Sequence, residues 1–158
     1  MTSRKKIRSH KYRLKLPLES ANLEIIRDFV GKIAANMGFD QEEIGNIELA
    51  VDEAATNVLR HAYREQDKAK QFILIEVTSY PDRIQISVID RGKGFNPAEI
   101  KPPRMDQYFK QMRRGGLGLY LIRTLMDRVD FSINPGKRNE VRMTKYLRET
   151  REKVSNPR

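Results

Sequence analysis

The sequence of 158 residues contains no cysteine and no tryptophan. Without cysteine the chain forms no disulfide and offers no thiolate to a metal, which fits a reducing compartment. No apolar run approaches the roughly 20 residues that a membrane span needs. The first residues, MTSRKKIRSHKYR, also lack the apolar segment of a signal peptide. These absences predict a cytoplasmic protein without membrane association, and the length allows one domain with a hydrophobic core.

Acidic residues are scarce at both ends of the chain, whose formal net charge is +10. No acidic residue occurs up to Lys15, and from Lys137 onward only three glutamates oppose the basic residues. We therefore predict basic tails at residues 1–10 and 149–158 around a domain at residues 11–148. Such tails are either solvated or attract an acidic protein, nucleic acid or an anionic membrane surface. No recognition helix or aromatic–basic RNA motif stands out, so direct nucleic-acid binding is not expected.

The spacing of apolar residues predicts alternating helices and strands. Ser20 is the expected N-cap of a first helix, and Gly38 is expected to end it. Asp40 and Glu43 predict a capping box at the start of a second helix. The order of elements favours an α+β fold, with an antiparallel or mixed sheet that carries its helices on one face. The predicted elements are an edge strand at 12–18, helices at 21–37 and 41–62, strands at 71–79 and 83–90, a polar lid at 95–114, a helix within 115–127, and strands at 129–133 and 140–147.

The stretch VIDRGKGFNP, residues 88–97, places an acid at the end of a predicted strand. Ile84, Ile86 and Val88 are apolar and alternate with polar residues, so Asp90 continues the apolar row. A carboxylate on the core side of a sheet is costly unless hydrogen bonds compensate it. Two explanations stay open: either a partner satisfies Asp90 there, or the strand has already ended and Asp90 opens a turn.

Two glycine clusters follow this strand. Gly92 and Gly94 permit a tight turn and a close approach of a ligand to the backbone. The stretch RRGGLG, residues 113–118, precedes an apolar helix, where backbone N–H groups freed by glycine and adjacent arginines favour an anion site. A packing role for these glycines is the alternative. Neither cluster forms a P-loop or lies in a dinucleotide-binding βαβ unit.

The second predicted helix contains Glu53 and Asn57, which are four residues apart and therefore share a face. A carboxylate and a carboxamide oxygen suit a hard cation such as Mg²⁺, and one of the two could instead act as a base. His61 continues the same ridge. An ordinary polar flank of a helix is the alternative interpretation of Glu53 and Asn57, and a surface or satisfied core histidine is that of His61.

The order of these motifs resembles that of the GHKL, or Bergerat-fold, ATPase superfamily: an ExxxN helix, a strand ending in DxGxG, a polar lid and a GGxGL helix. Within it, the stretches DEAATNVLRHAY, VIDRGKGFNP and RRGGLGLYLIRTLMD look most like anti-sigma-factor serine/threonine-protein kinases of bacterial partner-switching systems. The resemblance covers residues 12–147. It implies a Bergerat-type α/β sandwich with a mixed, mostly antiparallel sheet, in which residues 95–114 are the ATP lid.

The resemblance also implies a role for each motif. Asp90 would hydrogen-bond the exocyclic amine of adenine, while Gly92 and Gly94 would shape the floor of the adenine pocket. Asn57 would bind Mg²⁺, and Glu53 would be the general base. The phosphate-binding segment would contain Arg114 near the γ-phosphate, followed by the second glycine box at Gly115, Gly116, Leu117 and Gly118.

The chain departs from the family pattern before its last strand, where relatives often have Gly-Thr and this sequence has Arg138 and Asn139. Asn139 could still hydrogen-bond adenine. The implied function is ATP- and Mg²⁺-dependent phosphorylation of a STAS-type anti-anti-sigma protein by a homodimer that also binds a sigma factor or another effector. The alternative is an ATP-gated protein-binding regulator without kinase activity. A histidine-kinase fragment is not expected, because no dimerisation helix with a phospho-acceptor histidine precedes the motifs and the only histidines are His10 and His61. A charge-driven nucleic-acid binder leaves the three motifs unexplained.

Overall fold

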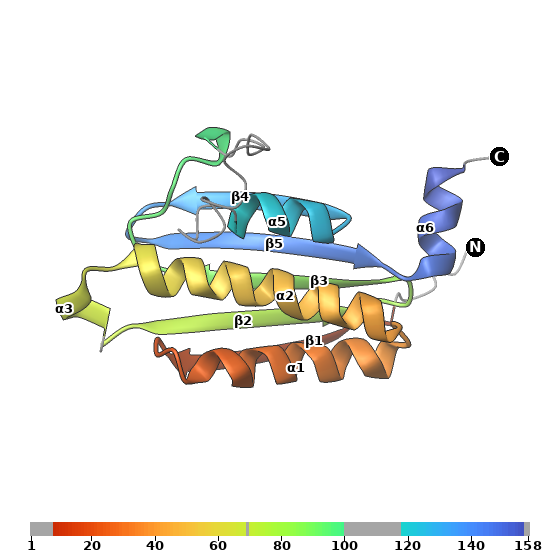
Figure 1. Cartoon of the computed structure of the whole chain (residues 1–158), viewed down its shortest axis with the longest axis horizontal. Helices are drawn as coiled ribbons and strands as arrows, with labels where there is room; N and C mark the ends of the chain where they lie inside the picture. The colour runs from red at the N-terminus through yellow and green to blue at the C-terminus, as the bar shows by residue number, and fades with distance from the viewer. Residues whose placement is uncertain (1–7, 69, 100–117, 157–158) are drawn as a thin grey trace, which may run out of the picture.

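The computed structural model describes residues 8–68, 70–99 and 118–156. Their strands form one five-stranded sheet in the order β1-β2-β3-β5-β4, and each neighbouring pair is antiparallel. The predicted α+β class is confirmed, and the strands of the described sheet are all antiparallel rather than mixed. β1 is an edge strand, as expected (Figure 1). The strands are β1 (His10–Pro17), β2 (Phe72–Ser79), β3 (Arg83–Asp90), β4 (Arg128–Asn134) and β5 (Arg138–Tyr146).

Three helices cover one face of the sheet: α1 (Asn22–Met37), α2 (Gln41–Asn57) and α5 (Gly118–Leu125), as Figure 1 shows. The hydrophobic core lies between these helices and the sheet. Ile47 and Val51 of α2 are fully buried, and so are Ile75 of β2 and Ile86 of β3. The alternation of apolar and polar residues in β2 and β3 thus fixes which face of the sheet receives the helices.

The first two helices illustrate which end signals the sequence contains. Gly38 ends α1 with a left-handed φ of 96°, as expected for a glycine at a helix C-terminus. Asp40 and Glu43 form the predicted capping box, with 2.8 Å from the Glu43 N–H to Asp40 Oδ1 and 3.1 Å from the Asp40 N–H to Glu43 Oε2. The prediction of Ser20 as an N-cap is wrong, because α1 begins after Ala21 and has no side-chain cap.

The helix predicted at 41–62 is α-helical only as far as Asn57. The next five residues, Val58–Ala62, form a π-helix (η1). Wider π turns inside helices occur frequently at functional sites. The carbonyl of Ala62, the last residue of η1, accepts a hydrogen bond from the Lys93 N–H at 3.0 Å, so this turn ends against the loop after β3.

Three short helices complete the described residues: α3 (Glu65–Lys68), a 3₁₀ turn η2 (Pro97–Glu99) and α6 (Arg148–Ser155). Helix α6 lies within the segment predicted as a basic C-terminal tail, at the end of the sheet remote from α3 (Figure 1). Among the described helices, none combines the length and apolar character needed to cross a bilayer.

Candidate functional site

The three motifs meet around one cavity of about 230 Å³ on the helical side of the sheet. The end of α2 with η1, the loop after β3 and the start of α5 each contribute part of its wall. The described residues that line it are Ala54, Asn57, Val58, His61, Ala62, Asp90, Gly94, Phe95, Gly118, Leu119 and Asn139. Segments separated by more than sixty positions in the sequence therefore form one site.

Asp90 is the last residue of β3 and is still paired in the sheet, where its Cα partner is Asn139. The explanation that the strand ends earlier is therefore wrong. Asp90 Oδ1 accepts hydrogen bonds from the Gly92 N–H at 2.7 Å and from Asn139 Nδ2 at 3.1 Å. These bonds compensate the cost of a carboxylate on the core side of the sheet. Within the described residues no hydrogen bond engages the second oxygen, Oδ2, of this cavity-lining side chain.

Asn139 connects the last strand to the glycine loop. Its Nδ2 donates to the Gly92 carbonyl at 2.8 Å as well as to Asp90, and the residue is only 3% exposed. Its Oδ1 is buried and has no hydrogen-bond partner within the described part of the chain. A buried acceptor without a partner is costly, and here it belongs to a residue that lines the cavity. A ligand with a hydrogen-bond donor would satisfy it.

Close packing explains both glycines of the loop. A Cβ atom at Gly92 would lie 2.3 Å from the Ala62 carbonyl oxygen, which already accepts a hydrogen bond from the Lys93 N–H at 3.0 Å. Gly94 has a φ of +68°, and a Cβ atom there would lie 2.7 Å from Ile133 Cγ2. The loop is thus held between the end of η1 and strand β4, and only glycine fits at either position.

Glu53 and Asn57 project toward the beginning of α5. A Cβ atom at Gly118 would lie 2.8 Å from Glu53 Oε2 and 3.1 Å from Asn57 Nδ2, so the missing side chain lets the two helices approach. Asn57 Nδ2 is buried and lacks a hydrogen-bond partner among the described residues. Burial raises the pKa of Glu53 and the Asp52 carboxylate raises it further, while Arg60 partly opposes them.

Several predicted site residues lie outside the described part of the chain. These are Arg114, Gly115, Gly116 and Leu117, together with residues 100–113 of the predicted lid. Gly118 is the one member of the second glycine box within it, and it is the first residue of α5.

Sequence reasoning missed the apolar wall of the cavity. Ala54 and Val58 belong to the apolar stripe of the second helix, and they serve the core and the cavity together. Phe95 follows the glycine loop and packs edge-on against Phe131, with ring centroids 5.4 Å apart. Tyr63 also went unnoticed, although its hydroxyl accepts a hydrogen bond from the Arg91 N–H at 2.8 Å. Only its position next to the ExxxN helix could have indicated it.

The cavity combines features that fit a purine. Apolar walls suit a flat ring, while Asp90 and Asn139 offer acceptors to ring and amine donors. The described residues contain no group of three or more His, Asp or Glu side chains that could bind a metal on their own. Mg²⁺ characteristically takes only one or two protein ligands and completes its shell with phosphates and water. The Asn57 amide is consistent with such a partial site.

Comparison with known proteins agrees with this geometry. A family model described as the histidine kinase-like ATPase domain matches residues 16–145. The serine-protein kinase RsbW of Bacillus pumilus strain SAFR-032 is 36% identical over 142 residues, covering 87% of this chain and 86% of that protein. RsbW of Listeria monocytogenes serotype 4a is 36% identical over 143 residues, and the match covers 88% of each chain.

Solved structures support the fold. The structure of the RsbU and RsbW domains of Rv1364c from Mycobacterium tuberculosis superposes with a TM-score of 0.62 at 19% identity, over 86% of this chain and 32% of that longer one. A chain in the crystal structure of the SiaB–SiaC complex from Pseudomonas aeruginosa gives a TM-score of 0.55 at 14% identity, over 86% of this chain and 89% of that one. Since the family model spans most of the sequence and the relatives match along nearly their whole length, the chain belongs to the histidine kinase-like ATPase family, in its anti-sigma-factor serine/threonine-protein kinase branch.

Proposed function

We propose that this protein is an ATP-dependent serine/threonine-protein kinase that acts as a partner switch. It phosphorylates a STAS-type anti-anti-sigma protein, and it binds a sigma factor or another effector in one nucleotide state. The observation that carries the proposal is the meeting of Asn57, Asp90 and the start of α5 around a single cavity, with the Glu53 carboxylate beside Gly118. The relatives named serine-protein kinase RsbW support the same class of reaction.

Adenine is held by the loop after β3 in this proposal. The exocyclic amine donates to Asp90, whose Oδ1 is fixed by the Gly92 N–H and by Asn139. Hydrogen bonds to a charged acceptor are stronger than neutral ones, so Asp90 selects a base that presents an amine. Asn139 Oδ1, buried and without a partner among the described residues, offers the second acceptor.

The phosphates lie toward Asn57 and the first turn of α5 in this proposal. Asn57 would hold Mg²⁺ through its amide oxygen, and the ion would supply charge neutralisation for the phosphates. Backbone N–H groups at the N-terminus of α5 are oriented for anions. Arg114, outside the described residues, adds a positive charge near the γ-phosphate.

Glu53 is the general base that removes the proton from the substrate hydroxyl. The raised pKa of Glu53, caused first by burial and then by Asp52, makes it a stronger base than an ordinary surface glutamate. A pure nucleotide-binding module has no need of a base beside the metal ligand. This feature favours the kinase over an ATP-gated regulator without kinase activity.

Calorimetric titration with ATP and Mg²⁺ tests the pocket. Asp90→Asn replaces an acceptor with a donor opposite the adenine amine, so we expect about 10- to 100-fold weaker binding, as for the loss of a charged hydrogen bond of about 1.5–3 kcal/mol. Asn57→Ala is expected to weaken the Mg²⁺-dependent part of binding. Asp82→Asn is the matched control, because Asp82 pairs with Arg83 at the far end of β3. If wild type binds no ATP at millimolar concentration, the kinase proposal is wrong.

Phosphoryl transfer from γ-labelled ATP to a panel of purified STAS-domain proteins tests the catalytic step. We expect wild type to label serine or threonine, and Glu53→Gln to keep its ATP affinity while transfer falls at least about 100-fold. Wild type that binds ATP and a partner protein but transfers no phosphate would support the ATP-gated regulator instead.

Homodimerisation, a cytoplasmic location and binding of a sigma factor complete the proposal. Sedimentation equilibrium of the purified protein with and without ATP tests homodimerisation. Pull-down of sigma factors in the presence of ADP and then of ATP tests sigma-factor binding. A monomer at all concentrations would contradict the dimer without affecting the kinase assignment.

A further inference from the structure

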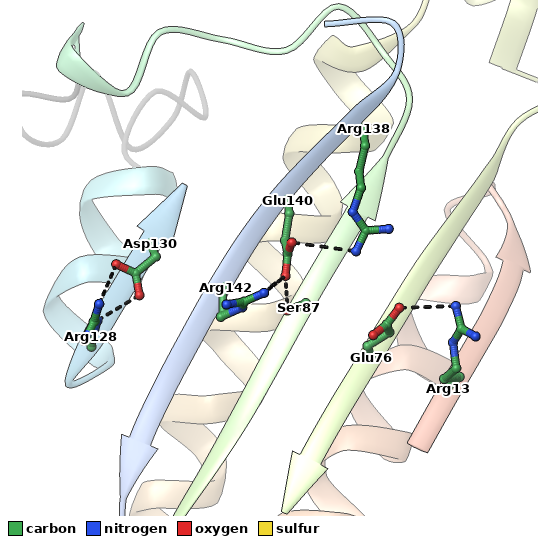
Figure 2. A network of polar contacts seen from close by, with 8 residues as sticks. All are labelled: Arg13, Glu76, Ser87, Arg128, Asp130, Arg138, Glu140 and Arg142. Atoms are coloured by element: carbon green, nitrogen blue, oxygen red, sulfur yellow. Dashed lines mark hydrogen bonds and ion pairs between the residues drawn. The ribbon is translucent and has the colours of Figure 1, made fainter. Parts of the chain in front are cut away.

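The face of the sheet opposite the helices carries a second set of charged side chains. Figure 2 shows three groups of ion pairs on this face. Arg13 contacts Glu76 at 3.3 Å, and Arg128 contacts Asp130 at 2.8 Å. The largest group surrounds Glu140, which accepts from the Ser87 hydroxyl at 2.6 Å and contacts Arg142 at 3.0 Å and Arg138 at 3.7 Å. The acids shown on this face are thus already neutralised by arginines.

A groove of about 700 Å³ lies beside these pairs, at the end of the sheet where β3 runs into the glycine loop. Its lining is rich in cations from four separate segments. The described residues that line it are Arg13, Lys15, Tyr63, Lys70, Gln71, Phe72, Leu74, Ile89, Asp90, Arg91, Lys137 and Arg138. Asp90 is the single acid in this set, and two hydrogen bonds already engage its Oδ1.

Four cations of the groove have no carboxylate partner within the described residues: Lys15, Lys70, Arg91 and Lys137. Their charges converge on a concave surface, where like charges raise the local potential and attract anions. An anionic occupant would relieve this repulsion. The groove is therefore complementary to a ligand that carries several negative charges.

We propose that this basic groove binds a short acidic segment of a partner protein in extended conformation. The groove reaches from β1 across β2 and β3 to the turn between β4 and β5. Neighbouring strands are about 4.8 Å apart, so crossing three intervals requires about 14 Å. An extended chain covers that distance with four or five residues, at about 3.3 Å each. Carboxylates along such a segment face Lys15 at one rim and Lys137 at the other.

The aromatic residues of the groove favour an acidic protein segment over single-stranded nucleic acid. Bases bind such surfaces by stacking on free aromatic faces. Phe72 is half exposed, but the ammonium group of Lys15 already lies 4.8 Å from its ring centroid. The Tyr63 hydroxyl is held by the Arg91 N–H, and its side chain is partly buried. One face of the Phe72 ring is therefore covered by a cation suited to a carboxylate.

The groove and the proposed adenine cavity share Asp90, but the four cations on which the groove proposal rests line the groove alone. Lys15 and Lys137 line the groove but not the cavity that holds Asn57 and Gly118. The ATP affinity of variants at Lys15 and Lys137 therefore tests the cavity, and their affinity for an acidic segment tests the groove. Failure of one proposal leaves the other intact.

Fluorescence anisotropy with a labelled octaglutamate peptide tests the groove at low and at high salt. We expect binding that weakens steeply with salt, and a loss of about fivefold in Lys15→Glu and in Lys137→Glu. Lys32→Glu is the matched control, because this exposed lysine lies on α1 at the helical face and changes the net charge equally. ATP titration of each variant should match wild type.

Four outcomes would overturn the proposal. Absence of octaglutamate binding at low salt removes its basis. Equal weakening in Lys32→Glu reveals a response to net charge alone. Tighter binding of oligothymidylate with the same sensitivity to Lys15→Glu assigns the groove to nucleic acid. If sedimentation shows that wild type is a dimer and that both groove variants dissociate it, the groove binds a second copy of the chain instead.

Discussion

Two glycines with the same backbone conformation offer a test of how the cavity floor is built. Gly94 has a φ of +68° and Gly136 a φ of +75°. A Cβ atom at Gly136 would find nothing within 4 Å, whereas at Gly94 it would lie 2.7 Å from Ile133 Cγ2 and 3.0 Å from Asn139 Oδ1. Gly136→Ala therefore measures only the cost of a left-handed backbone conformation for alanine. Gly94→Ala has the same cost and adds a steric clash of the new Cβ atom with Ile133 and Asn139.

The magnitudes follow from these contacts. The left-handed conformation costs an alanine about 1–2 kcal/mol relative to glycine, so Gly136→Ala should lose about that much stability. Crowding of packed side chains adds about 1–3 kcal/mol at Gly94. For a chain of this size each kcal/mol corresponds to about 2–4 °C in Tm. Displacement of Asn139 also disturbs its bonds to Asp90 and Gly92, so we expect about tenfold weaker ATP binding in Gly94→Ala.

Urea unfolding and ATP calorimetry of both variants measure the two effects. Gly136→Ala keeps its N–H bond to the Gly92 carbonyl, which is 2.8 Å long, and should bind ATP like wild type. Equal losses of stability in the two variants, with wild-type ATP affinity in both, would refute the contact argument at Gly94.

Three further predictions concern single side chains. Asp40→Ala removes the capping box of α2 and should lower the free energy of unfolding by about 1 kcal/mol, measured by urea denaturation; an unchanged midpoint would contradict the cap. Burial raises the pKa of Glu140, but the Ser87 hydroxyl and the two arginines outweigh it, so the pKa is lowered. Wild type should therefore be more stable than Glu140→Gln above the ordinary glutamate pKa of about 4.3 and lose that advantage as pH falls through the lower folded-state value; a difference independent of pH would contradict this. The pKa of Glu53 is raised, so this base becomes protonated at a higher pH than an ordinary glutamate does. As the pH falls, the rate of phosphoryl transfer should therefore begin to decline above the ordinary glutamate pKa, and a pH-independent rate would exclude Glu53 as the base.

Local patterns were sufficient for most of the fold. Alternating apolar residues located β2 and β3 to within a residue of their bounds, since a half-buried strand requires period two. Gly38 and the capping box located the junction of α1 and α2, because these residues satisfy helix ends locally. The π-helical turn after Asn57 and helix α6 were missed, since neither has a distinct local signal.

The sequence by itself determined the strands, the three helices that cover the sheet, their order and the family motifs, because each depends on residues that are close along the chain. Only the tertiary structure decided how Asp90 is satisfied, since its partner Asn139 is 49 positions away and becomes its neighbour through pairing of β3 with β5. The same holds for Gly118 against Glu53 and for the basic groove, whose cations come from four segments. Contacts of this kind arise when strands and helices pack, and no local spacing specifies them.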